Sequence, residues 1–94
     1  MLKVFTLTQT DKNDDTPVYI LTDGKFFRTA FHPDGWSDQP DYDLGDDGRI
    51  YRTKSHPKGF SKLPDYSFGK DRRLYRTADH PDGKSDAPEF VIQD

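Results

Sequence analysis

The three histidines of this 94-residue chain recur at a fixed spacing, and each directly precedes a proline. They are His32, His56 and His80, 24 residues apart. If three imidazoles converged on one axis, they could hold a zinc ion and leave one coordination position open. In a repeated sequence, however, every turn residue recurs, and a histidine before proline can simply bond the backbone of its own turn. We therefore assign no metal ligands and treat the three histidines as candidate ligand-binding residues.

An arginine recurs with the same period, next to an aromatic residue and a threonine. These arginines are Arg28, Arg52 and Arg76. A planar guanidinium can bind carboxylates, phosphates or sugar hydroxyls, so the three residues are also candidates for ligand binding. The favoured alternative is structural, an ion pair with the acids that recur as well, namely Asp41, Asp65 and Glu89. Because Val18 occupies the acidic position of the first copy, we expect Arg28 to lack such a partner.

Two aromatic residues follow the histidine-containing turns and complete the candidate site. Trp36 and Phe60 occupy this position in two copies, whereas the third copy has Lys84. An aromatic ring beside a polar turn can stack on a sugar or contact a partner protein. The sites of the three copies are therefore expected to be unequal.

The sequence contains none of the common catalytic motifs, namely GxSxG, a glycine-rich phosphate loop or HExxH. It has no cysteine, which excludes disulfides, thiolate metal sites and a cysteine nucleophile. We expect neither enzymatic activity nor a cofactor.

Composition limits the partners and the location. The net charge is −3, with no Lys/Arg-rich face, so a nucleic-acid partner is not expected. No segment approaches the roughly 20 apolar residues that cross a bilayer, and the N-terminal apolar run is too short for a signal peptide. The sequence therefore predicts a soluble cytoplasmic protein.

The length of 94 residues leaves room for one small domain. Hydrophobic residues make up 31% and aromatic residues 14% of the chain. Such a domain has a thin core, and burial between copies in a homo-oligomer would extend it.

The elements that must position these residues come from internal repetition. Residues 17–39, 40–63 and 64–87 are three copies of one unit, and residues 88–94 begin a fourth. An N-terminal strand within residues 1–9 and an acidic loop over residues 10–16 precede them. Repetition at a fixed period indicates one supersecondary unit packed on copies of itself.

Each unit is predicted to be a β-hairpin followed by a further turn. In the second copy, residues 41–44 alternate polar and apolar as in a half-buried strand, residues 45–49 form a turn, and residues 50–55 form a second strand. Residues 56–59 form a second turn, after which residues 60–62 return as a short third strand. In the third copy, residues 70–72 of the corresponding turn contain no glycine. Each unit begins with a proline, at positions 17, 40, 64 and 88, which places a bend or a strand start there.

The alternation also predicts the core. The first strands share one apolar face, formed by Tyr19, Leu21, Tyr42, Leu44, Tyr66, Phe68, Phe90 and Ile92. The second strands contribute one of two sets, either Phe26, Ile50 and Leu74 or Phe27, Tyr51 and Tyr75. A shift of one residue exchanges these faces, so both alternatives remain open.

The predicted fold is all-β, an antiparallel meander of tandem hairpin repeats of about 24 residues. Pairing of residues 2–8 with the strand that begins at Phe90 would close it into a small barrel or propeller-like ring and remove the sheet edges. The alternative is an open sheet.

Three functions follow in order of preference. The first is a non-catalytic binding or interaction module that presents similar surfaces to a protein or glycan partner. The second is a structural subunit that self-assembles, and the third is a metal-binding protein built on the histidine turns.

Overall fold

The computed structural model describes residues 2–6 and 16–93, and within them the regular elements are all β-strands. The strands are β1 (Leu2–Thr6), β2 (Tyr19–Thr22), β3 (Lys25–Arg28), β4 (Pro40–Leu44), β5 (Arg49–Arg52), β6 (Tyr66–Phe68), β7 (Arg73–Arg76) and β8 (Phe90–Gln93). None of the described residues belongs to a helix that could span a membrane. The acidic loop predicted over residues 10–16 lies, apart from Thr16, outside the described residues.

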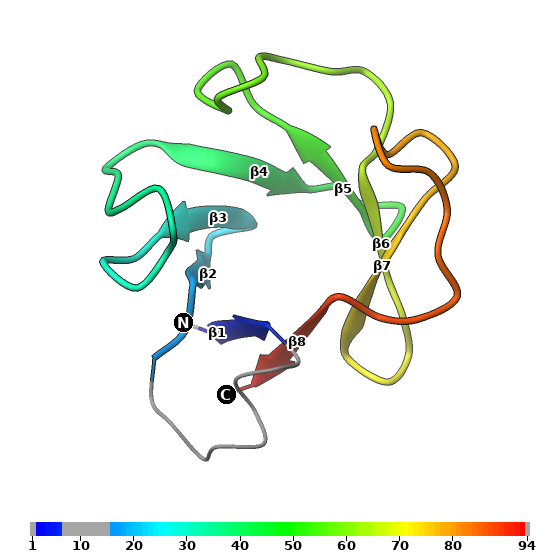
Figure 1. The fold of residues 1–94 in the computed structure, drawn as a ribbon, viewed down its shortest axis with the longest axis horizontal. Coiled ribbons are helices and arrows are strands. Elements are labelled where there is room, and N and C mark those ends of the chain that lie inside the picture. The colour runs from blue at the N-terminus through cyan, green and yellow to red at the C-terminus, as the bar shows by residue number, and fades with distance from the viewer. Residues whose placement is uncertain (1, 7–15, 94) are drawn as a thin grey trace.

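The eight strands form a closed antiparallel barrel in which each strand pairs with its neighbours in the sequence. The closing contact joins β1 to β8, with Val4 opposite Ile92 and Thr6 opposite Phe90. Figure 1 shows the ring of strands, with the long connections after β3, β5 and β7 on three of its sides. The predicted closure by the N-terminal strand is confirmed.

The barrel consists of four hairpins with one shared register. In each hairpin the same position of the first strand lies opposite the same position of the second, giving the pairs Tyr19–Arg28, Tyr42–Arg52, Tyr66–Arg76 and Phe90–Thr6. The fourth hairpin is therefore assembled from the two ends of the chain, with β8 as its first strand and β1 as its second. In sequence order these two strands are reversed, which is why β1 resembles no complete repeat.

The structure decides between the two faces of the second strands. Phe26, Ile50 and Leu74 are almost fully buried, and Val4 fills the same position in the hairpin formed by the chain ends. All eight apolar residues predicted on the first strands belong to this core or pack against it. Phe27, Tyr51 and Tyr75 lie on the outside and are half-buried.

The hairpin turns follow their sequences closely. Asp23 and Gly24 both have positive φ, at 53° and 75°, as the predicted two-residue turn requires. Gly48 has φ 78° in the longer turn of the second copy. Arg72 takes the same place in the third copy with φ 65°, so a bulky residue adopts a left-handed conformation there.

The predicted third strand of each unit is wrong. The residues after each His-Pro turn, including residues 60–62, form no strand. The reason is local side-chain bonding: the Ser61 hydroxyl donates to the carbonyl of Leu63 and accepts the Leu63 N–H. Ser37 and Ser85 do the same in the other copies, and such bonds occupy the backbone groups that a sheet ladder would use.

A threonine fixes the base of each long connection. The hydroxyls of Thr29, Thr53 and Thr77 donate to the carbonyls of the prolines that begin the same units, Pro17, Pro40 and Pro64. The same hydroxyls accept a backbone N–H two residues further on. The predicted proline bends are thereby tied to the end of each hairpin.

Candidate functional site

The three histidines lie at one end of the barrel, and each bridges its own turn to a core tyrosine. Their Nδ1 atoms accept the backbone N–H groups of Asp34, Lys58 and Asp82, each at 3.0 Å. Their Nε2 atoms lie 3.1, 3.0 and 3.3 Å from the hydroxyls of Tyr19, Tyr42 and Tyr66. Because Nδ1 accepts, the imidazole is neutral and carries its proton on Nε2, which donates to the tyrosine oxygen. The backbone-bonding role considered from sequence is confirmed.

The arginines and acids form ion pairs across successive units. Arg28 Nε lies 3.3 Å from Asp41 Oδ2, Arg52 Nε lies 3.2 Å from Asp65 Oδ2, and Arg76 Nε lies 3.6 Å from Glu89 Oε2. The expectation that Arg28 lacks a partner is wrong, since each arginine pairs with the acid of the following unit rather than of its own. The predicted pairing of the other two arginines is confirmed.

Asp41 owes its position to an irregularity in the ladder. Phe26 pairs with Tyr42 and Phe27 pairs with Pro40, so Asp41 is an extra residue between them. A bulge of this kind redirects a side chain, and here it accompanies a carboxylate that is buried beside Arg28.

Tyrosine hydroxyls connect the histidines to the acids. Tyr19 donates to Asp41, and Tyr66 is hydrogen-bonded to Glu89. Each copy thus places a histidine bonded to a tyrosine near a carboxylate that pairs with an arginine; for the second copy these residues are His56, Tyr42, Asp65 and Arg52. We call each such group of four residues a rim network.

The aromatic rings below these networks form a closed set. Tyr19 packs edge-to-face on Tyr42, Tyr42 on Tyr66, Tyr66 on Phe90 and Phe90 on Tyr19, with centroids 5.5–6.1 Å apart. This geometry is the preferred one for aromatic pairs. The four rings close one end of the hydrophobic core.

The hairpin formed by the chain ends replaces the polar members of the rim network with uncharged residues. Phe90 takes the tyrosine position, Thr6 the arginine position and Val18 the acid position. Where this hairpin meets the first copy, Thr6 and Val18 therefore stand in place of the arginine and the acid that pair between the other units. Replacing the arginine and the acid together avoids leaving one member of the ion pair buried without the other.

The three rim networks surround a cavity of about 290 Å³ on the barrel axis. All three histidines line it, and each Nε2 is bonded to a tyrosine. Among the described residues, no group of three or more histidine, aspartate or glutamate side chains is arranged to hold a metal ion.

Burial sets the pKa values at the rim. Desolvation lowers the pKa of His32 and lowers that of His56 to about 4, where Arg52 and Lys58 add to the effect. Desolvation raises the pKa values of Tyr19, Tyr42 and Tyr66. It also raises the pKa of Asp41 and Asp65, against the opposing influence of their arginines. Neutral histidine and neutral tyrosine suit a structural network better than proton transfer near pH 7.

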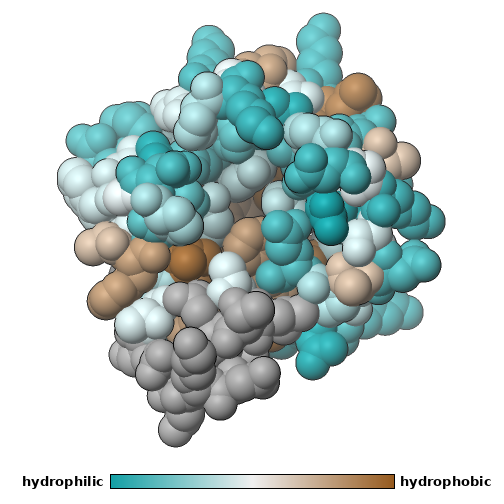
Figure 2. Space-filling model, in the orientation of Figure 1, coloured by the Kyte–Doolittle hydropathy of each residue, from teal (hydrophilic) through white to brown (hydrophobic). Residues whose placement is uncertain are grey.

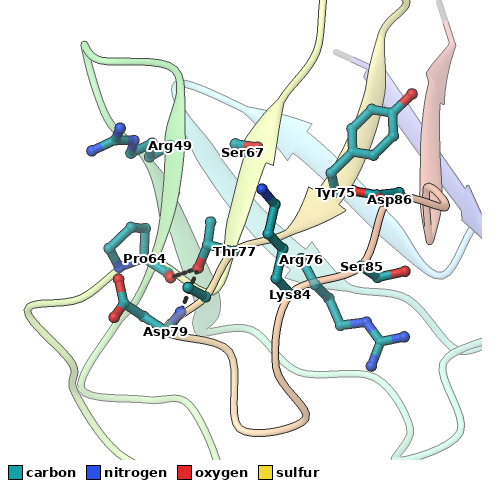
Figure 3. Close-up of a pocket in the computed structure, with 11 residues that line it drawn as sticks. Arg49, Pro64, Ser67, Tyr75, Arg76, Thr77, Asp79, Lys84, Ser85 and Asp86 are labelled. Atoms are coloured by element: carbon teal, nitrogen blue, oxygen red, sulfur yellow. Dashed lines mark hydrogen bonds between the residues drawn. The ribbon is translucent and has the colours of Figure 1, made fainter.

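Two grooves on the outside of the barrel occupy equivalent positions in successive units. The first groove, about 320 Å³, lies where copies one and two meet and is lined by Lys25, Gln39, Pro40, Asp43, Thr53, Lys54, Ser55 and Phe60. The second groove, about 550 Å³, lies where copies two and three meet and is lined by Arg49, Pro64, Ser67, Tyr75, Arg76, Thr77, Ala78, Asp79, Lys84, Ser85 and Asp86 (Figure 3). Lys25 corresponds to Arg49, Pro40 to Pro64, Asp43 to Ser67, Thr53 to Thr77 and Phe60 to Lys84.

The candidate aromatics Trp36 and Phe60 are exposed, by 68% and 60%. Phe60 lines the first groove, and Trp36 holds the equivalent position in copy one. The face in Figure 2 is largely hydrophilic, and its apolar areas are separate rather than continuous.

The grooves bring together some candidate residues and add others that the sequence did not suggest. Of the predicted ligand-binding residues, Phe60 and Arg76 line the grooves, whereas the histidines line the axial cavity. The basic residue that opens the second strand, Lys25 or Arg49, was not anticipated. The sequence pattern that could have revealed it is a lysine or arginine at the same position of every hairpin, which is Lys3 in β1 and Arg73 in β7.

Comparison of the chain with models of known protein families, with curated proteins and with solved structures found no match.

Proposed function

We propose that this protein is a non-catalytic, multivalent binding module whose outer grooves take glycans. The observation that carries the proposal is the recurrence of one groove at two successive junctions, lined by equivalent residues. A surface built twice on one rigid barrel can bind two residues of one polymer, and avidity then adds to weak individual contacts.

The lining of the grooves supports a sugar ligand. Each combines hydroxyl groups, charged side chains and one aromatic ring, namely Phe60 in the first and Tyr75 in the second. A sugar ring has polar edges and an apolar face, so it can bond the polar groups while it stacks on the ring. Both volumes lie in or near the range of about 300–1,000 Å³ that is usual for small-ligand sites.

The rim residues support a non-catalytic role. Around the axial cavity, His56 bonds Tyr42 and Arg52 pairs with Asp65, and burial opposes charge on His56 and on Tyr42. A general base or nucleophile needs a group that is free to exchange a proton near the working pH. The rim network instead holds the long connections that carry the groove residues.

The test is a titration of ¹⁵N-labelled protein with chitotriose, cellotetraose, mannotriose and trigalacturonate, followed by NMR. Amide shifts confined to the groove residues, including Thr53 and Thr77, are expected for at least one of these probes. If none of them shifts a groove amide, the glycan proposal is overturned.

A matched pair of variants locates the site. Phe60→Ala removes the exposed ring from the first groove, and binding there should weaken by about 3- to 10-fold, the range of an aromatic stacking contact. Leu63→Ala is the control, because Leu63 is comparably exposed on the same connection but does not line the groove. Equal effects of the two substitutions would count against the groove.

Self-assembly is a second candidate, favoured by four large exposed apolar residues on two connections: Phe31, Trp36, Phe60 and Leu63. Sedimentation velocity over about a hundredfold range of protein concentration, from 5 to 500 μM, decides between self-assembly and a monomer. A homo-oligomer that dissociates on substitution of Phe31 and Leu63 would support assembly, whereas a monomer throughout would exclude it.

A further inference from the structure

We propose that the second groove selects saccharides that carry an oxyanion, either a carboxylate or a sulfate. This inference rests on the proposed glycan binding and adds the chemical class of the sugar. It follows from two substitutions between otherwise equivalent grooves.

The first substitution removes an acid. In the first groove, Lys25 Nζ lies 3.2 Å from Asp43 Oδ1, so the base is neutralised by a carboxylate within the groove. In the second groove, Arg49 takes the place of Lys25, but the residue opposite it is Ser67. The carboxylate that balances the first groove therefore has no counterpart here.

Asp47, an acid in the turn before Arg49, is held by hydrogen bonds within that turn. Hydrogen bonds from the Tyr51 hydroxyl and from the backbone N–H of Arg49 lower the pKa of Asp47. Its two oxygens lie 2.6 Å from the Tyr51 hydroxyl and 3.0 Å from that N–H. These bonds lock the hairpin turn. The Arg49 side chain interacts with Asp47 and Tyr51, and its guanidinium has more N–H groups than these contacts use, so it can also bind a ligand.

The second substitution adds a base. Lys84 occupies the position of Phe60, so a ring in the first groove is replaced by an ammonium group in the second. Figure 3 shows the Lys84 side chain extending across the groove toward Ser67, between Arg49 and Tyr75. A sugar stacked against Tyr75 would present its substituents to this ammonium group.

Of the other charged residues of the groove, Arg76 is paired, Asp79 is turned away from Lys84, and Asp86 lies in the groove. The Arg76 guanidinium points away from Lys84 in Figure 3, and it pairs with Glu89 and Asp82 at 3.6 and 4.0 Å. The carboxylate of Asp79 lies beside Pro64, on the far side from Lys84. Asp86 lies beside Tyr75, so a sugar hydroxyl could donate to it while the oxyanion meets the two bases.

The experiment compares oligosaccharides that differ only in charge. Trigalacturonate and its methyl ester share one backbone, and 6-sulfated and unsulfated N-acetyllactosamine form the second pair. Binding is measured by calorimetry and by amide shifts of Thr77 and Lys84. We expect the charged member of at least one pair to bind the second groove at least tenfold more tightly, since hydrogen bonds to charged groups are the stronger ones. Higher salt should reduce the difference.

Substitutions assign the preference to the two bases. Lys84→Gln and Arg49→Gln should each remove most of the preference for charge, whereas Lys54→Gln, a lysine that lines the first groove, should not. Lys84→Phe copies the second unit and should shift binding toward the neutral sugars. Lys84 is exposed, so its variants should melt like the parent protein.

The outcomes distinguish the charge preference from the glycan binding on which it rests. Equal binding of the charged and neutral members, with shifts in the grooves, overturns the charge preference and leaves glycan binding standing. Absence of binding by every saccharide overturns both. A preference for charge that survives Lys84→Gln and Arg49→Gln also overturns the inference.

Discussion

Among single residues, Asp65 and Arg52 show best how a buried charge is retained in this small barrel. Their side chains are 3% and 15% exposed, and each arginine pairs with the acid of the next unit. At the junction closed by the chain ends, Thr6 and Val18 replace such a pair with two uncharged residues. The barrel therefore contains both the charged and the neutral form of one junction.

The first prediction concerns this pair. Arg52→Met leaves Asp65 buried without its partner and should destabilise the protein by about 3–5 kcal/mol. Adding Asp65→Val should recover a large part of that loss, because it imitates the neutral junction. The free energy of unfolding in urea measures both effects. The control is the half-exposed pair Lys25–Asp43, where removing either member should cost only about 0–1 kcal/mol. Additive effects of the two substitutions would show that the ion pair is not coupled.

Arg72 carries a second prediction, because it holds a positive φ of 65° in a turn where the preceding copy has Gly48. A left-handed conformation costs a residue with a Cβ roughly 1–2 kcal/mol, and glycine avoids that cost while losing more entropy on folding. Arg72→Gly should therefore stabilise the protein by about 0.5–1 kcal/mol, seen as a higher urea midpoint.

Gly48→Ala is the matched control for this turn. A Cβ at Gly48 meets no atom within 4 Å, so only backbone strain would change. It should destabilise the protein by about 1 kcal/mol. A lower midpoint for Arg72→Gly would mean that the contacts of the arginine side chain outweigh the strain.

Among the elements, the turns that contain His32 and His56 respond to pH. The folded state lowers the pKa of His56 from about 6.5 in the unfolded chain to about 4, and it lowers that of His32 as well. A lowered histidine pKa means that the unfolded chain binds the proton better. The stability is therefore complete above pH 6.5 and falls as the pH drops toward 4.

The third prediction is a loss of about 1–3 kcal/mol between pH 7 and pH 4.5 from His56. The raised pKa values of Asp41 and Asp65 act in the opposite direction and offset part of it at the acid end. Chemical denaturation at pH 7, 5.5 and 4.5 measures the slope. His56→Gln should make the slope shallower. A free energy of unfolding that stays constant from pH 7 to 5 would contradict the neutral histidine assigned here.

The elements also show how far the sequence could be interpreted. The hairpins, their turns and the inward first-strand residues could be predicted, because alternation and turn chemistry are local signals. The third strand was wrong, since Ser61 bonds its own backbone two residues on and no periodicity reveals that. The faces of the second strands required tertiary structure, because a one-residue shift preserves the pattern.

The candidate site was only partly predictable for a related reason. The partner of Arg28 lies in the next unit, and a comparison of positions within one unit cannot find it. The grooves combine the start of one unit's second strand with the long connection of the following unit, as Arg49 and Lys84 show. Such sites appear only when adjacent units are placed side by side.

Across the whole molecule, closure by the chain ends predicts a strong effect of truncation. Deleting residues 1–9 removes β1, with the buried Val4 and Phe5, and leaves β2 and β8 as unpaired edges. Each large apolar side chain contributes about 1.5–3 kcal/mol, a large part of the stability of a small domain. The truncated protein should lose its cooperative thermal transition, as followed by circular dichroism.

A circular permutant provides the control for truncation. Joining the two ends by a short Asn-Gly turn and opening the chain at Asp46 keeps every strand and should retain a cooperative transition. If the truncated protein melted near the parent temperature, β1 would not be needed to close the barrel.

The hairpin formed from the two ends also determines the order of events during folding. The hairpins β2–β3, β4–β5 and β6–β7 each need only a short turn, and such hairpins form within about 1–10 μs. The β1–β8 ladder must bring together segments separated by almost the entire chain, which costs the largest loop-closure entropy in the molecule. Closure is therefore the slow step. Until it occurs, β1 and β8 expose free edges, and intermolecular strand pairing competes with the completion of the barrel.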